Sequence, residues 1–146
     1  MNYCRVSNLC GGGSCAKLLI MVDIDILKSI MSRYKKAWET LDSDAIIEIF
    51  TEDATYQVTP FKDPYVGHTE IQKYWREVVT TKEKDVEVSL DNFYVFGDTG
   101  MVEWSTKFTR NDNGNVEYLK GIILVEIRER KIQKLWEYWH KNEIKT

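Results

Sequence analysis

Three side chains in the sequence are suited to proton transfer: Tyr34, Asp91 and His140. An imidazole exchanges protons near neutral pH, and a neighbouring carboxylate can orient it. His140 ends the stretch "KLWEYWH", where two tryptophans and a tyrosine precede it. A pair of His140 and an inward-turned Asp91 is the most reactive arrangement that we can build. The alternatives are a solvated His140 and an Asp91 that serves only an irregularity in its strand.

Aromatic side chains are the compositional outlier, with five Trp, eight Tyr and five Phe. Large rings fill protein cores, but they also wall ligand pockets, and both interpretations remain open. We expect Tyr34 and His140 to provide polar contacts to a ligand. The expected pocket walls are Trp38, Tyr56, Trp75, Trp104, Trp136 and Tyr138.

The hydrophobic pattern predicts helices first and strands afterwards. Apolar residues at helical spacing predict a first helix from Ile24 to Leu41, and "DSDAIIEIF" predicts a second. A capping box of Thr69 and Gln72 predicts a third helix, which runs through Val78. From Asp85 on, the pattern changes to period two. It predicts four strands: "VEVSLDNFYVF", "MVEWSTKFT", "NVEYLKGIILVEI" and "KIQKLWEYWH". This order predicts an α+β fold with the N-terminal helices packed on one face of an antiparallel sheet.

Two-residue turns at Asn113-Gly114 and Glu129-Arg130 predict the register of the last three strands. They place Thr106, Gly121 and Tyr138 in one row across the inner face of the sheet. Because Gly121 has no side chain, this row predicts a gap among inward-facing rings, which a ligand or a helix ring would fill.

Three further features concern the same sheet. Lys134 is the one misfit on the inner face, where its stem would have to snorkel. A phase change at Asp91-Asn92 predicts a β-bulge. The opposite face mixes charges with an apolar group, which predicts a homodimer interface. That group is Ile122, Leu124, Leu135 and Trp139.

Bulk composition excludes several classes of protein. With 146 residues the chain suits one domain, and a net charge of −3 without a basic stripe argues against nucleic-acid binding. No apolar run approaches the ~20 residues of a membrane span. The three cysteines lie within residues 1–15, without the partners of a zinc site. We expect a flexible leader over 1–20, a single cytoplasmic domain over 21–146, and neither metal nor cofactor.

Three stretches in this order resemble the nuclear-transport-factor-2-like superfamily, which includes SnoaL-like polyketide cyclases and ketosteroid isomerases. They are "YKKAWETLDSDAIIEIFTEDATY", "VGHTEIQKYW" and "KIQKLWEYW". The resemblance implies a cone-shaped α+β fold, in which a curved sheet wraps a long helix around an apolar pocket. It also implies a dimer, and it places Tyr34 where ketosteroid isomerases carry an oxyanion donor.

The resemblance implies a site that differs from that of an isomerase. The positions of the isomerase base and of its second oxyanion donor hold Val58 and Ile123, so ketosteroid isomerase activity is not expected. His140 stands where SnoaL-like proteins often carry an aspartate. We expect a protein that binds a small apolar or aromatic ligand, with or without cofactor-free isomerase, cyclase or dehydratase chemistry. The alternatives are a non-catalytic dimeric interaction module and a structural dimer with a ring-filled core.

Overall fold

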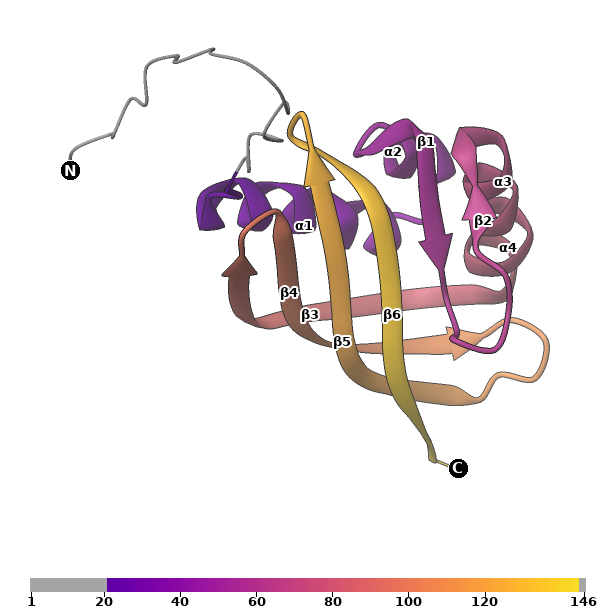
Figure 1. Ribbon diagram of the computed structural model, residues 1–146. Helices are drawn as coiled ribbons and strands as arrows, with labels where there is room; N and C mark the ends of the chain where they lie inside the picture. Colours follow the sequence, from indigo (N-terminus) through magenta and orange to yellow (C-terminus); the bar gives the residue numbers. More distant parts are fainter. Residues whose placement is uncertain (1–20, 145–146) are drawn as a thin grey trace, which may run out of the picture.

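The computed structural model describes residues 21–144, and the side chains up to residue 142. The predicted leader over residues 1–20, with its three cysteines, lies outside the described residues. The described chain folds as helices packed on a strongly curved six-stranded sheet (Figure 1). The predicted α+β class is therefore confirmed.

Short polar caps start the first two helices. Helix α1 spans Ile24–Glu39, and the Asp23 side chain caps it by accepting from the backbone N–H of Asp25. Helix α2 spans Ser43–Ile47, and the carboxylate of its cap Asp42 accepts two backbone N–H groups. The third predicted helix consists of three joined pieces. They are α3 (Gly67–Tyr74), the π-helical turn η1 (Trp75–Val79) and α4 (Thr80–Lys82).

The sheet has the strand order β2-β1-β6-β5-β4-β3. Antiparallel pairing joins β3 to β6 as a meander, as the sequence predicts. Strand β1 pairs with the C-terminal strand β6 in parallel, which the sequence pattern does not reveal. The strands are β1 (Phe50–Gln57), β2 (Tyr65–Val66), β3 (Glu83–Phe96), β4 (Thr99–Arg110), β5 (Val116–Arg128) and β6 (Lys131–Ile144).

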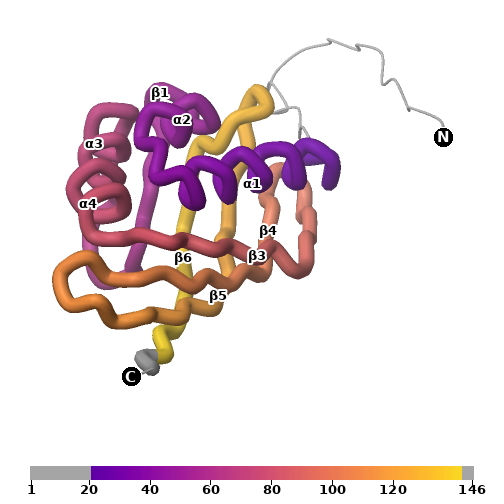
Figure 2. The backbone as a smooth tube through the Cα atoms, turned by 180° about the vertical axis from the view of Figure 1, so that it is seen from behind, coloured from indigo at the N-terminus to yellow at the C-terminus, as the bar shows by residue number. Residues whose placement is uncertain are grey.

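Helix α1 lies across the inner face of the curved sheet, and α3 and α4 stand beside it (Figure 2). It also covers the free edge of β3, where the Glu39 carboxylate accepts from the backbone N–H of Val88 and Lys35 donates to its carbonyl. Both polar groups of this edge residue are thereby satisfied, which protects an otherwise open strand. Among the described residues, no helix is long and apolar enough to cross a membrane.

The pairing of β4 with β5 departs from the predicted register by two residues. Trp104 lies opposite Gly121 and Phe108 opposite Glu117, because the connection after Arg110 is longer than a two-residue turn. A shift of two residues leaves every side chain on its predicted face. The predicted inner face of these two strands is therefore right, although the predicted pairs are wrong.

The pairing of β5 with β6 departs by one residue, which is more serious. The turn at Glu129-Arg130 forms as predicted, with both residues at positive φ, and Ile127 still faces Ile132. Glu126, however, faces Lys134, so Gln133 has no partner and forms a β-bulge. From there on, β6 presents the opposite set of side chains to the core.

Gly121 marks a close approach of strands rather than the predicted gap. A Cβ atom built on this residue would lie 2.0 Å from the carbonyl oxygen of Tyr138 and 2.7 Å from the Cα of Trp139. Backbone of β6 therefore occupies the space that a side chain would need. The predicted row of Thr106, Gly121 and Tyr138 does not exist, since Thr106 faces Leu119 and Gly121 faces Trp139.

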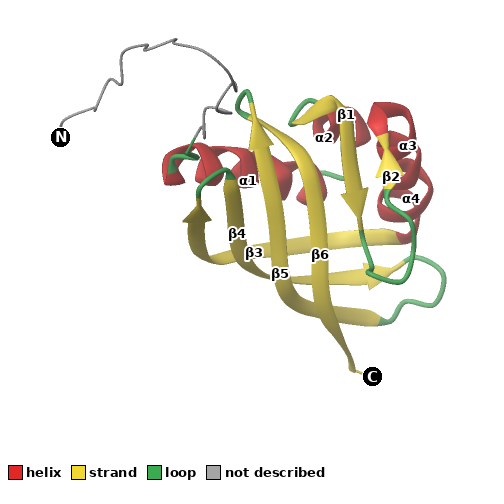
Figure 3. Cartoon of the chain, viewed as in Figure 1, coloured by secondary structure: helices red, strands yellow, loops and turns green. Residues whose placement is uncertain are grey.

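The β-bulge predicted at Asp91-Asn92 is confirmed. The pairing of β3 with β4 shifts between Leu90 and Phe93. The strands bend sharply around the helices, as the secondary-structure view shows (Figure 3).

Candidate active site

A cavity of about 230 Å³ lies between helix α1, the π-helical turn and the inner face of the sheet. Aromatic rings form most of its wall. Three glutamates, each less than a tenth exposed, also line it. The rings are Tyr34, Trp38, Tyr56, Tyr74, Trp75, Phe108 and Trp139, and the glutamates are Glu83, Glu117 and Glu137. We call this space the inner cavity.

Glu137 is the central polar group of the inner cavity. Its Oε1 accepts hydrogen bonds from the Tyr34 hydroxyl at 2.8 Å and from the Tyr56 hydroxyl at 2.5 Å. The two hydroxyl oxygens lie 3.1 Å apart. Helix α1, strand β1 and strand β6 each contribute one member. The bulge at Gln133 turns Glu137 inward to meet the other two.

Burial dominates the protonation of these groups. Desolvation raises the pKa of Glu137 from 4.5 to about 7, although hydrogen bonds from Tyr56, Tyr34 and Trp139 act in the opposite direction. Burial raises the pKa of Tyr34 and of Tyr56 well above the usual value, and the charge of Glu137 adds to the effect. The tyrosines therefore keep their protons and act as donors, while Glu137 gains or loses its proton near neutral pH.

Glu83 is a second buried carboxyl group in the same cavity. Its Oε2 accepts a hydrogen bond from the Trp38 indole Nε1 at 2.8 Å. Desolvation raises its pKa to about 7. The Trp38 hydrogen bond opposes this shift, and the charge of Glu137 adds to it.

Charged side chains meet at one end of the inner cavity. Lys141 Nζ lies 2.8 Å from Glu117 Oε1, and Arg110 Nε lies 4.0 Å from the same oxygen. The Lys141 side chain is 33% exposed and that of Arg110 is 24% exposed. These ion pairs add partly exposed charged groups to the lining of the cavity, whereas Glu137, at 5% exposed, is its most buried carboxyl group.

Trp75 contributes a polar group that no other side chain uses. The ring lines the cavity and is 1% exposed. Its indole Nε1 is buried without a hydrogen-bond partner among the described residues. A buried donor without a partner costs about 1–3 kcal/mol.

Four of the aromatic residues predicted at the site line the inner cavity: Tyr34, Trp38, Tyr56 and Trp75. Trp104 lies behind them in the core, 1% exposed, with its ring 5.4 Å from that of Trp38. It supports the wall instead of forming it. Their roles in binding remain predictions.

The β6 residues predicted at the site do not face the inner cavity. Trp136 lies on the outer face beside Lys134, Tyr138 is 47% exposed, and His140 is exposed. The prediction that they point inward is wrong, because the extra residue Gln133 reverses the alternation after Ile132.

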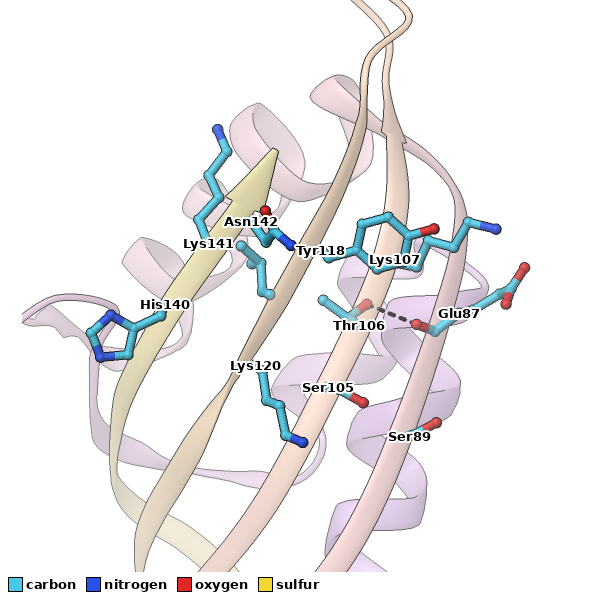
Figure 4. Close-up of a pocket in the computed structure, with 11 residues that line it drawn as sticks. Glu87, Ser89, Ser105, Thr106, Lys107, Tyr118, Lys120, His140, Lys141 and Asn142 are labelled. Carbon is cyan, nitrogen blue, oxygen red and sulfur yellow. Dashed lines mark hydrogen bonds between the residues drawn. The ribbon is translucent and has the colours of Figure 1, made fainter. Parts of the chain in front are cut away.

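The structure does not bring His140 and Asp91 together at the inner cavity. Asp91 is exposed at the bulge of β3, and His140 lies on β6 with β4 and β5 between them. His140 lies instead beside Lys120 at an open hollow of about 540 Å³ on the outer face of the sheet (Figure 4). Polar and exposed side chains such as Lys120 and Asn142 surround this hollow, which lacks a buried acid or base.

The sequence interpretation missed Glu137 and Glu83. Glu137 lies in the aromatic stretch that drew attention, but on the face taken as outer. The misfit of Lys134 on the inner face was the available signal, because a one-residue slip after Ile132 exchanges it for Leu135 and Glu137. Glu83 begins a strand inside a charged stretch, and nothing in its sequence context distinguishes it. Across residues 21–144, the structure shows no cluster of three or more side chains suited to hold a metal ion.

Comparisons with solved structures support the fold. A proposed aromatic ring hydroxylase of Novosphingobium aromaticivorans is 24% identical, with a TM-score of 0.74 over 84% of this chain and 93% of that one. The epoxide hydrolase/cyclase-like enzyme SalBIII is 24% identical, with a TM-score of 0.67 over 77% and 89% of the two chains. A hexachlorocyclohexane dehydrochlorinase is 12% identical, with a TM-score of 0.71 over 83% and 88%.

At these identities the structural similarity shows the fold alone. No curated protein matches the chain. The model of the SnoaL-like domain matches residues 31–135, which include the second half of α1, the cavity-lining helices and the sheet up to the start of β6. The chain therefore belongs to the SnoaL-like domain family, within the nuclear-transport-factor-2-like fold.

Proposed function

We propose that the protein binds a small cyclic molecule in the inner cavity and that Glu137 transfers protons to and from it. The observation that carries the proposal is the Glu137 carboxyl group, buried in the cavity between two tyrosine donors. The reaction needs no cofactor and belongs to isomerisation, cyclisation or dehydration. In each of these a base removes a proton from carbon or oxygen, and the electrons of that bond rearrange.

The environment of Glu137 suits a general base. An acid–base catalyst works best when its pKa lies near the working pH, and burial raises the pKa of Glu137 to about 7. Tyr34 and Tyr56 hold one carboxyl oxygen in place, which orients the other as the candidate acceptor of a substrate proton. In this proposal Tyr34 positions the base instead of contacting an oxyanion.

The size of the cavity limits the ligand. A space of about 230 Å³ is below the usual range for drug-sized ligands, and a cavity of about 150 Å³ already holds benzene. One six-membered ring with small substituents therefore fits, and a steroid does not.

The structural relatives support chemistry of this kind without identifying the reaction. One is described as a dehydrochlorinase and another as an epoxide hydrolase/cyclase-like enzyme. Because one fold hosts many activities, the assignment rests on Glu137 and its donors and not on the family.

Exchange of α-protons tests the proposal without knowledge of the natural substrate. Cyclohexanone in D₂O loses its α-protons when a base removes them, and proton NMR follows the loss. We expect exchange above the buffer rate with the wild-type protein and a fall of about 100-fold or more with Glu137→Gln. Glu52→Gln, a change at an exposed site, is the matched control. Buffer-level exchange with the wild-type protein would remove Glu137 as a base.

A second function is a non-catalytic dimeric module. The outer sheet face favours it, because Tyr138 is exposed there and Trp136 is only partly buried. Two members of the apolar group predicted for a homodimer interface lie elsewhere, because Leu135 is buried and Trp139 lines the inner cavity. Of that group, Ile122 and Leu124 remain on the outer face of the sheet. Tryptophan fluorescence separates the two functions, since cyclic ketones should quench it only if they enter the inner cavity.

A further inference from the structure

Glu83 is the strongest group in the molecule that the proposed function leaves unused. It is 8% exposed, lines the inner cavity with Glu137, and comes from the edge strand β3, which β5 and β4 separate from β6. A buried carboxyl group at the start of a strand has no structural need to face a cavity. Within the described part of the chain it forms no ion pair closer than 4.0 Å, and the hydrogen bond to its carboxylate comes from Trp38.

Helix α1 holds both carboxyl groups from one side. Tyr34 and Trp38 are four residues apart, so their side chains lie one turn apart on the same face of the helix. Tyr34 donates to Glu137 and Trp38 donates to Glu83. Each carboxyl group has one oxygen accepting from this helix, and a molecule in the inner cavity lies within the space that both of them line.

We propose that Glu83 is a second catalytic residue, the general acid that works with Glu137 as the base, and that the pair dehydrates small cyclic β-hydroxy ketones. The inference rests on the proposed function, because it needs Glu137 to remove a proton. It adds the substrate class. A hydroxyl group is a poor leaving group, so its departure needs an acid that an isomerase acting through one base lacks.

The step balances within the pair. The Glu137 carboxylate takes the proton from the carbon next to the ketone, and the electrons of that C–H bond form the C=C bond. The C–O bond at the β-carbon breaks with its electrons on oxygen, which takes the proton of Glu83 and leaves as water. Glu137 is then protonated and Glu83 ionised. Transfer of one proton from Glu137 to Glu83 restores the pair with no external oxidant or reductant.

The charge of the site agrees with this division of roles. Two carboxylates in a buried space repel one another, so the state with only one of them ionised is favoured near neutral pH, and the charge of Glu137 raises the pKa of Glu83. Glu137 receives two tyrosine donors against one indole donor for Glu83, which stabilises the ionised form on Glu137. The base is therefore Glu137 and the acid is Glu83.

Other charged groups around Glu83 also shift its pKa, so they affect how the proposed reaction depends on pH. Arg110 acts to lower its pKa, and Glu117, which is itself paired with Lys141, acts to raise it. The backbone carbonyl of Glu83 accepts from Asn111 and is not part of the cavity chemistry.

Dehydration of 3-hydroxycyclohexanone to cyclohexenone tests the inference, because the conjugated product absorbs in the ultraviolet. Wild type, Glu83→Gln, Glu83→Asp, Glu137→Gln and the control Glu52→Gln are compared in this assay and in the cyclohexanone exchange assay. We expect Glu83→Gln to lower dehydration about 100-fold or more and to lower exchange far less. Glu83→Asp should restore part of the dehydration, and Glu137→Gln should abolish both reactions.

The pH profile separates a chemical role from a structural one. Dehydration by the wild-type protein should give a bell-shaped pH profile. The rate should rise on the acid side as the base Glu137 ionises, and it should fall on the alkaline side as the acid Glu83 loses its proton. Glu83→Gln should lose the alkaline fall and keep the acid rise. Circular dichroism establishes that each variant is folded, and Glu83→Asp provides a second variant if the amide is not tolerated.

Each outcome decides one of the two proposals. Exchange without dehydration by the wild-type protein, or equal losses of both reactions in Glu83→Gln, would overturn the role of Glu83 and leave Glu137 as the base. No exchange by the wild-type protein would overturn the proposed function, and the inference with it. Loss of dehydration that greatly exceeds loss of exchange supports both.

Discussion

Replacing Glu137 by Gln should change how stability depends on pH, and this prediction needs no substrate. The pKa of this carboxyl group rises from 4.5 to about 7 on folding, so its ionisation lowers the free energy of unfolding of the protein by about 3 kcal/mol. Between these values the folded state holds a proton that the unfolded state has released. The free energy of unfolding therefore falls as pH rises, by up to about 1.4 kcal/mol per pH unit, and levels off above about pH 7.

Glutamine has nearly the shape of glutamic acid, and its amide oxygen can accept from Tyr34 and Tyr56, but it does not ionise. The free energy of unfolding of Glu137→Gln, relative to that of wild type, should therefore increase by about 3 kcal/mol between about pH 5 and pH 8. Urea unfolding followed by tryptophan fluorescence at several pH values measures this difference. Part of the fall with pH should persist in the variant, because Glu83 is also buried with a raised pKa.

Glu52→Gln again serves as the control, since this exposed change should leave the slope of stability against pH as it is in wild type. The reasoning would be refuted if wild type and Glu137→Gln lost stability in parallel across this pH range. Glu137 would then be hydrated in solution, and its proposed use as a base near neutral pH would lose its physical basis.

Three other predictions concern packing, capping and assembly. Gly121→Ala should cost about 3 kcal/mol or more in urea unfolding, because its Cβ would lie 2.0 Å from the Tyr138 carbonyl oxygen, and Ser105→Ala on the outer face is the control. Asp42→Ala should cost about 1 kcal/mol by removing the cap of α2, and Asp42→Asn should recover most of it. Sedimentation should show a homodimer that Tyr138→Arg weakens; a wild-type monomer at every concentration would contradict an interface on the outer face.

The order of elements and the inner faces of β4 and β5 were predictable from the sequence, because hydrophobic periodicity survives a register error of two residues. The inward set of β6 was not, because a single unpaired residue, Gln133, reverses it. Alternation alone favoured an inward position for Trp136 and Tyr138, because large aromatic rings are expected in the core. It could not distinguish that register from the one that buries Leu135 and Glu137.

Half of the site was visible in advance for a related reason. Tyr34, Trp38 and Trp75 lie on helical segments whose apolar faces the sequence defines, and all three line the inner cavity. The carboxyl groups were not predicted because pattern arguments place charged residues in water. The buried position of Glu137 depends on donors from α1 and β1, which are distant in sequence and come together only in the folded chain.

The hydrogen bond between Tyr34 and Glu137 joins residues 103 positions apart, and parallel pairing places β6 between β1 and β5. During synthesis, a ribosome will already have released the helices and five of the strands before the segment that inserts between β1 and β5 emerges. Until then the aromatic wall has no strand to close it, and contacts of such long range make folding slow. The aromatic rings that β6 covers therefore stay uncovered in the nascent protein until this last strand emerges.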